Sequence, residues 1–93
     1  MTPRDAFSPY AITIADRHFF VFANDHPPPR AHVRLQTSDR MLLVDLRTGD
    51  PMPLDWPRGA LREWDDLRPQ ATRHFPKLLA EFERLNPTRE DRQ

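Results

Sequence analysis

Residues 24–34 read Asn-Asp-His-Pro-Pro-Pro-Arg-Ala-His-Val-Arg, and this stretch decides how the chain folds. A run rich in aromatic residues ends before it, and a run that alternates apolar and polar residues begins within it. The three consecutive prolines fix three φ angles and remove three backbone donors, so they predict a stiff loop that pairs with no strand. We therefore expect two antiparallel strands joined by a loop that holds its flanking side chains in place.

The segments around this loop have strand patterns. Residues 17–23 are aromatic and β-branched, and they carry apolar groups on both faces, which favours a central strand. Alternation places His18, Phe20 and Phe22 on one face of it, and Arg17, Phe19 and Val21 on the other. Residues 31–36 alternate as in a half-buried antiparallel strand with a basic wet face. Residues 10–14 and 40–47 predict two further strands, and the short connections favour an antiparallel meander.

Helical spacing begins after residue 54. Asp55 fits an N-cap and Pro57 a first turn, and apolar residues then recur at steps of three and four. Because a proline inside a helix removes a hydrogen bond and clashes with the preceding turn, Pro69 and Pro76 predict two helices. These are residues 57–68 and 76–86, with a bent connection at 69–75. The side chains expected to cover the sheet are Trp64, Leu67, Phe75, Leu78, Leu79 and Phe82.

The expected fold class is therefore α+β: a three- to four-stranded antiparallel meander followed by two C-terminal helices packed on one face. A chain of 93 residues predicts a single domain, 1–93, with an ordered core at about 10–86 and loosely held ends at 1–9 and 87–93. The chain has no cysteine, which excludes disulfides and thiolate zinc sites and favours a cytoplasmic location. No apolar run approaches the length of a membrane span and the N-terminus does not resemble a signal peptide, so we expect no membrane partner.

Charge and motifs exclude further classes. Lysine and arginine number 14 and so do the acidic residues, and a neutral total argues against wrapping duplex DNA by charge alone. Thirteen of the basic residues are arginines, whose planar fork of donors suits phosphates. The sequence has no glycine-rich phosphate loop, serine elbow or cysteine nucleophile, so hydrolysis by a P-loop and acyl transfer by a triad are excluded.

The titratable residues around the prolines are the candidates for chemistry. One interpretation is a metal site, in which His26 and His32 meet across the loop beside Asp25. Their spacing matches no established ligand pattern, so we predict no metal and no cofactor. The alternative is that these histidines simply face solvent.

A second interpretation is acid–base catalysis by His32, Arg34, Arg30 and His26. A base, an acid and a cation suffice to cleave a phosphodiester when RNA supplies its own 2′-hydroxyl as nucleophile. The alternative is a basic strand face that makes weak surface ion pairs with Asp45 or with Asp65 and Asp66. His18 is predicted to be a sheet histidine with one hydrogen bond.

Several stretches resemble a bacterial and phage family of short proteins that is classed as a domain of unknown function. Residues 17–23 resemble its aromatic strand, Asp25 stands where it has an acidic residue, and residues 28–34 are similar to its Pro-Pro-His-Ile-His-Val-Arg motif. Residues 60–64 and 77–82 are similar to its helical half. Arg30 replaces the first histidine of the motif, which leaves His32 alone.

The resemblance implies a component of a toxin–antitoxin-like pair with a cognate small protein partner. Two hypotheses follow. In the first, the protein acts on RNA, with His32 as acid or base and Arg30 and Arg34 gripping phosphate. In the second, it is a non-catalytic module that binds a protein through its helical face or its proline loop. A homodimer is compatible with both.

Overall fold

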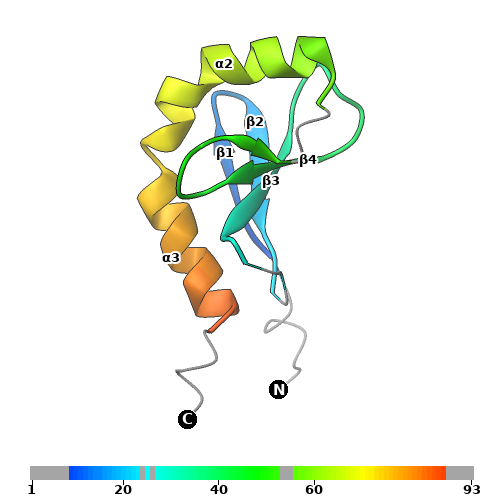
Figure 1. The fold of residues 1–93 in the computed structure, drawn as a ribbon. Coiled ribbons are helices and arrows are strands. Elements are labelled where there is room, and N and C mark those ends of the chain that lie inside the picture. The colour runs from blue at the N-terminus through cyan, green and yellow to red at the C-terminus, as the bar shows by residue number, and fades with distance from the viewer. Residues whose placement is uncertain (1–8, 24, 26, 53–55, 88–93) are drawn as a thin grey trace.

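A five-stranded antiparallel sheet carries two helices on one face (Figure 1). This arrangement comes from a computed structural model, which describes residues 9–23, 25, 27–52 and 56–87. The strands lie in chain order: β1 (Tyr10–Ile14), β2 (Arg17–Val21), β3 (Arg30–Arg34), β4 (Leu42–Asp45) and β5 (Pro51–Met52). The helices are α2 (Arg58–Thr72) and α3 (Phe75–Leu85). The expected α+β class, a meander followed by two helices on one face, is confirmed, with a short fifth strand added.

Each strand connection has a local cause. Ala15 and Asp16 form a two-residue turn with φ of 51° and 65°, which is the backbone that a tight β1–β2 hairpin requires. β4 ends at Asp45, whose carboxylate accepts the backbone N–H of Arg47 at 2.7 Å. Gly49, with φ of 80°, then turns the chain back into β5. The strands at 17–23 and 40–47 are thus shorter than predicted, since turns of this kind occupy their ends.

The prediction that Pro69 ends the first helix is wrong. Pro69 lies inside α2, and the connection between the helices shrinks to residues 73–74. The proline falls in the last turn, and the carbonyl it leaves without an N–H belongs to Asp65, which is exposed to water. Burial of Ala71 and Phe75 holds the chain in place beyond it. Pro76, by contrast, lies in the first turn of α3, which begins one residue earlier than predicted, at Phe75.

At the start of α2, Pro57 is the capping residue and makes no side-chain cap, and Asp55 lies outside the described residues. The expected loose ends, 1–9 and 87–93, also lie almost wholly outside them.

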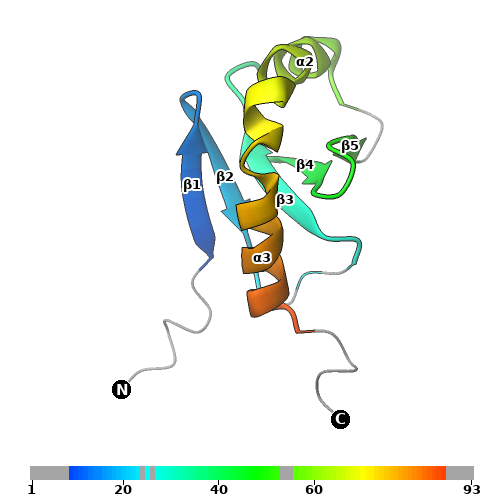
Figure 2. The ribbon, with the colours of Figure 1, turned by 90° about the vertical axis from the view of Figure 1, so that its left-hand side faces the viewer.

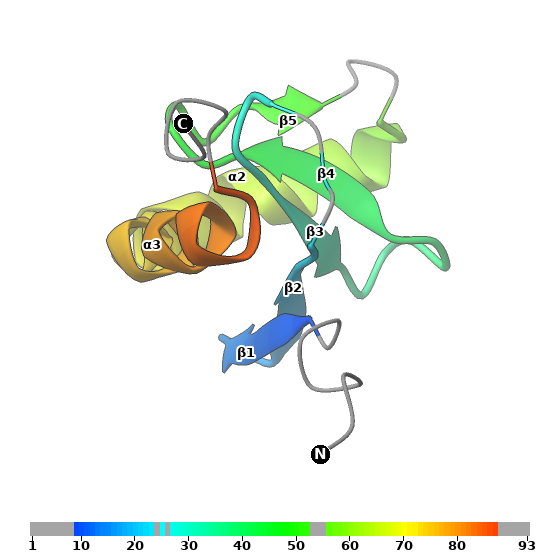
Figure 3. The ribbon, with the colours of Figure 1, turned by 90° about the horizontal axis from the view of Figure 1, so that it is seen from below.

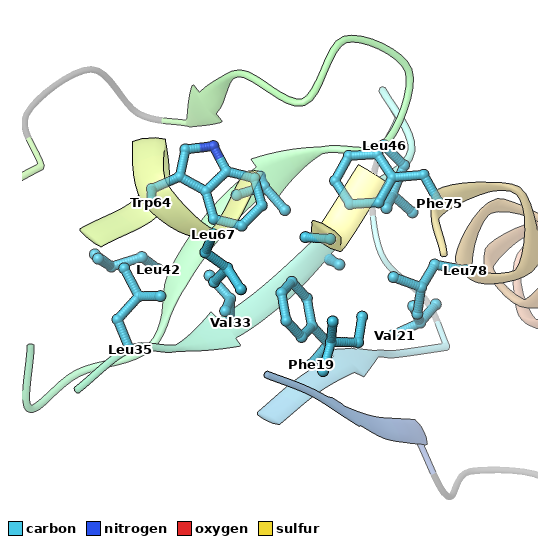
Figure 4. Close-up of a cluster of buried hydrophobic side chains, with 14 of the residues drawn as sticks. Phe19, Val21, Val33, Leu35, Leu42, Leu46, Trp64, Leu67, Phe75 and Leu78 are labelled. Carbon is cyan, nitrogen blue, oxygen red and sulfur yellow. The ribbon is translucent and has the colours of Figure 1, made fainter. Parts of the chain in front are cut away.

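The core lies between the sheet and the helices (Figure 4). Trp64 of α2 is its centre: the ring stacks with Phe75 at 6.4 Å between centroids, and Nε1 donates to the Gly49 carbonyl oxygen at 2.9 Å. Of the side chains predicted to cover the sheet, all but the half-buried Leu79 are buried. The inner face of the sheet contributes Phe19, Val21, Ala31, Val33, Leu42 and Val44.

Glu63 ties α2 to the sheet from within this interface. Its carboxylate accepts hydrogen bonds from Arg17 Nε, the Gln36 and Thr37 backbone N–H groups and the Thr37 hydroxyl, at 2.6–2.8 Å. Burial alone raises the pKa of this carboxyl, but the hydrogen bonds from Thr37, Gln36 and Arg17 lower it to about 2. The ionised carboxylate of Glu63 therefore stabilises the folded state.

Both helices lie on the same side of the sheet (Figures 2 and 3). The strand residues that point away from them alternate with the core residues and are exposed or half-buried. Among the described residues, no helix covers this side. None of the described helices is long and apolar enough to cross a membrane.

Candidate functional site

The side of the sheet opposite the helices, here called the open face, carries all of the described candidate residues. It is defined by His18, Phe20 and Phe22 from β2 and its continuation, and by Arg30, His32 and Arg34 from β3. The strands are in register, with Phe20 opposite His32 and His18 opposite Arg34. The predicted alternation along residues 17–22 is therefore confirmed. This alternation places the rings of His18, Phe20 and Phe22 next to β3, the strand that carries the basic residues.

His32 and Asp25 form a hydrogen-bonded pair at one end of the open face. His32 Nε2 lies 3.3 Å from Asp25 Oδ2, and the two side chains are 27% and 16% exposed. The edge of the Phe22 ring meets the imidazole at 4.6 Å between centroids and 89°. No hydrogen bond reaches His32 Nδ1 from the described part of the chain. The imidazole is thus oriented by a carboxylate on one side and by a ring on another.

Asp25 is positioned by a residue from the other end of the chain. Its backbone N–H donates to Asn86 Oδ1 at 2.8 Å, and Asn86 Nδ2 donates to the carbonyl oxygens of Phe22 and Phe82 at 2.8 and 3.1 Å. Asn86 follows the last turn of α3. The end of this helix therefore fixes the start of the proline loop. Sequence reasoning missed this role because nothing local links residues 61 positions apart.

Arg30 is hydrogen-bonded to the proline loop. Its guanidinium donates to the carbonyl oxygens of Pro28 and Pro27 at 3.3 and 3.1 Å, and its Nε lies 4.0 Å from Asp25 Oδ1. Those bonds satisfy acceptors in a segment where proline supplies no donors. Arg30 accordingly stabilises the loop next to Asp25.

Arg34 is the exposed cation of this strand. It lies two residues from His32 on the same face, about 6.5 Å along the strand. That separation suits a phosphate group held between the two side chains. His26, the fourth predicted residue, lies outside the described residues.

The alternative of an ion-paired basic face is met in part: Arg30 and His32 lie within ion-pair distance of Asp25, and not of the expected Asp45, Asp65 or Asp66. Asp45 lies opposite Arg30 on β4, but its carboxylate accepts the backbone N–H groups of Arg47 and Thr48. Asp65 and Asp66 are exposed on α2, which lies on the other side of the sheet.

A row of rings leads along the open face to the His32–Asp25 pair. The centroids of His18 and Phe20 lie 6.4 Å apart, and those of Phe20 and Phe22 lie 6.2 Å apart with planes inclined by 24°. His18 Nδ1 is 3.1 Å from the Thr13 hydroxyl, which fits the single hydrogen bond expected for it. His18 is exposed and the two phenylalanines are half-buried, so ring surface is accessible from solvent.

The arrangement can transfer a proton and hold an anion. A neutral imidazole that donates to a carboxylate through one nitrogen can accept a proton at the other, and the carboxylate then stabilises the imidazolium. The described residues offer no cluster of metal ligands. In residues 9–23, 25, 27–52 and 56–87, no three His, Asp or Glu side chains come together as metal ligands would.

Comparison with known proteins identifies no relative. The chain matches no protein-family model, no curated protein and no solved structure.

Proposed function

We propose that the open face binds single-stranded RNA and cleaves it, with the 2′-hydroxyl of the RNA as the nucleophile. The observation that carries this proposal is the His32–Asp25 pair at the end of a row of accessible rings, with exposed Arg34 two residues away. Rings supply stacking surfaces for bases, and a histidine with an arginine supplies the minimum chemistry for a phosphodiester.

In the proposed reaction, His32 Nδ1 takes the proton of the 2′-hydroxyl as O2′ forms a bond to phosphorus. The bond between phosphorus and O5′ breaks, and O5′ takes a proton from water. The products are a 2′,3′-cyclic phosphate and a 5′-hydroxyl, and the imidazolium returns its proton to solvent. Asp25 keeps the ring oriented and stabilises the imidazolium, and Arg34 stabilises the charge that develops on the phosphate oxygens.

Single-stranded RNA suits this surface better than a duplex. Base faces are hidden in an A-form helix but can be splayed onto aromatic side chains in a single strand. Arg34 is the exposed arginine beside the rings, so few phosphates are neutralised and stacking supplies most of the affinity. We therefore expect binding that weakens only modestly as salt is added.

The resemblance to a family encoded in toxin–antitoxin-like pairs adds a cognate small protein to this proposal. A partner on the helical side would leave the open face accessible. A partner on the proline loop would cover the His32–Asp25 pair, and it would neutralise the activity directly.

The test is cleavage of a fluorescently labelled single-stranded RNA by purified protein. We expect His32→Ala to lower the cleavage rate by about 100-fold or more, the usual contribution of a general base. His74→Ala is the matched control, because His74 is an exposed histidine between α2 and α3. Circular dichroism verifies that both variants fold. Equal cleavage by His32→Ala and the wild type contradicts the proposal.

A second candidate function is non-catalytic protein binding. It is favoured by an open hollow of about 530 Å³ between the β4–β5 turn and the bend joining the helices, lined mainly by Leu46, Thr48, Thr72, Phe75, Pro76 and Leu79. Such a hollow would accept an apolar side chain of the cognate partner. If the wild type neither binds nor cleaves RNA, and Leu79→Arg abolishes capture of the partner, this function replaces the first.

A further inference from the structure

The free edge of β1 is the least protected feature of the sheet. β1 is the first strand in the order β1-β2-β3-β4-β5, and no described helix or strand lies beyond it (Figure 2). The opposite edge, β5, is two residues long and begins with Pro51, which are common ways of blocking strand pairing. β1 is five residues long, and its sequence Tyr-Ala-Ile-Thr-Ile has no charge and no proline. An edge of this kind is a template for another strand.

The hairpin determines which backbone groups this edge presents. In a two-residue hairpin the residues that flank the turn, here Ile14 and Arg17, exchange both hydrogen bonds. Since this pattern alternates, Ile12 and Tyr10 also direct their backbone groups toward β2. Ala11 and Thr13 direct theirs outward. Pro9 has no N–H, so the usable edge begins at Ala11.

We infer that β1 pairs antiparallel with β1 of a second copy of this chain, with a two-fold axis at Ile12. In that register Ala11 lies opposite Thr13 of the second copy, and each such pair exchanges two backbone hydrogen bonds. With the axis at Ile12, both outward-facing residues, Ala11 and Thr13, take part in hydrogen-bonded pairs. The edge is therefore self-complementary, as an isologous two-fold interface requires.

The side chains suit the same partner. The inner side of the contact brings together the half-buried Ile12 side chains of the two copies, and it sets Tyr10 opposite Ile14 of the second copy. The outer side pairs Ala11 with Thr13, both exposed and uncharged. Beyond the strand, Lys77 lies 5.4 Å over the Tyr10 ring and also pairs with Glu81. This register brings Lys77 toward the turn that carries acidic Asp16 of the second copy, and none of the paired residues of β1 is charged.

Pairing of this kind joins two sheets into one. Because the axis is perpendicular to the sheet, the open faces of both copies lie on the same side and become continuous. The contact is small, so we expect a weak dimer with Kd between about 1 μM and 1 mM. The inference rests on the strand edge and is independent of any action on RNA.

Two double variants test it. Ala11→Lys with Thr13→Lys places like charges opposite each other in both pairs of the dimer, whereas Ala11→Lys with Thr13→Glu places opposite charges there. Both variants lose the Thr13–His18 contact, so they are matched. By sedimentation velocity from 10 μM to 1 mM, we expect the wild type and the Lys/Glu variant to dimerise, and the Lys/Lys variant to have a Kd at least tenfold higher.

Amide hydrogen exchange identifies the surface. Exchange at Ala11 and Thr13 is expected to slow as the protein concentration rises, while Ile12, whose N–H faces β2, stays protected throughout. The inference is overturned if the wild type is monomeric at 1 mM, or if the Lys/Lys variant dimerises like the wild type. Protection of Ala11 and Thr13 in a monomer also overturns it, because another part of the chain then covers the edge.

Discussion

Two carboxylates near the sheet are used in different ways. Glu63 is buried and accepts hydrogen bonds from Arg17, Gln36 and Thr37, so it stabilises the fold. Asp25 is half-buried and accepts from His32 on the solvent side of the sheet, so it orients a ring. Of these two carboxylates, only that of Asp25 has its hydrogen-bond partner on the open face.

Glu63 predicts how stability depends on pH. Its carboxyl has a pKa of about 2 in the folded protein, below the ordinary 4.5. The stabilisation by the ionised group is therefore complete above pH 4.5 and is lost as the pH falls toward 2. The difference corresponds to about 3 kcal/mol.

We expect Glu63→Gln to lower the free energy of unfolding at pH 7 by about 2–3 kcal/mol and to flatten its decline between pH 4.5 and 3. Urea unfolding at several pH values measures this. Glu83→Gln, at an exposed position on α3, is the control and should behave like the wild type. A Glu63→Gln protein with wild-type stability at pH 7 would show that the hydrogen bonds contribute nothing.

A substitution of Phe20 tests the proposed source of RNA affinity. It lies in the middle of the row of rings, between His18 and Phe22. Loss of one stacked base costs about 1–3 kcal/mol, so Phe20→Ala should raise the Kd for single-stranded RNA by about 5- to 150-fold. Fluorescence anisotropy measures it. Leu43→Ala removes a half-buried, non-aromatic side chain that points the same way from β4, and it should change the Kd little. Equal losses in both variants would exclude stacking.

The C-terminal end of α3 is hydrogen-bonded to the loop that follows β2. Asn86 at its end accepts the Asp25 N–H and donates to the Phe22 carbonyl. We expect Asn86→Ala to lower kcat for RNA cleavage by about tenfold or more while KM changes little, because it displaces Asp25 and leaves His18, Phe20 and Arg34 in place. Steady-state kinetics measures both constants. A change in KM alone would mean that Asn86 acts on binding rather than on the alignment of His32.

The same elements show what local sequence can predict. Strand alternation correctly put Phe19 and Val21 on one face and Phe20 on the other, because side chains in a strand alternate whatever lies around them. It did not show that the Phe19 face is the buried one, since both faces carry apolar groups. The contact of Asn86 with Asp25 could not be predicted, since it depends on how α3 packs. The helix end predicted at Pro69 was wrong, because the burial of Ala71 and Phe75 outweighs the one hydrogen bond that the proline removes. β5 is two residues long, too short to leave a pattern.

At the scale of the whole molecule, the sheet separates two surfaces with different uses. Both helices lie on one side (Figure 3), and the hollow lined by Leu46, Phe75 and Leu79 lies beside them. The rings, His32 and Arg34 lie on the other. A neutral chain of 93 residues can thus offer a stacking surface without a large basic field. A proposed protein partner on the helical side and the proposed RNA on the open face would therefore not compete.

The most direct test of this account is an NMR titration of isotope-labelled protein with a short single-stranded RNA carrying 2′-O-methyl groups, which cannot supply the nucleophile. The account predicts chemical-shift changes at His18, Phe20, Phe22, His32 and Arg34, with α2 and α3 unaffected. Changes confined to the helices, or no change at millimolar RNA, would contradict the claim that the open face acts on RNA.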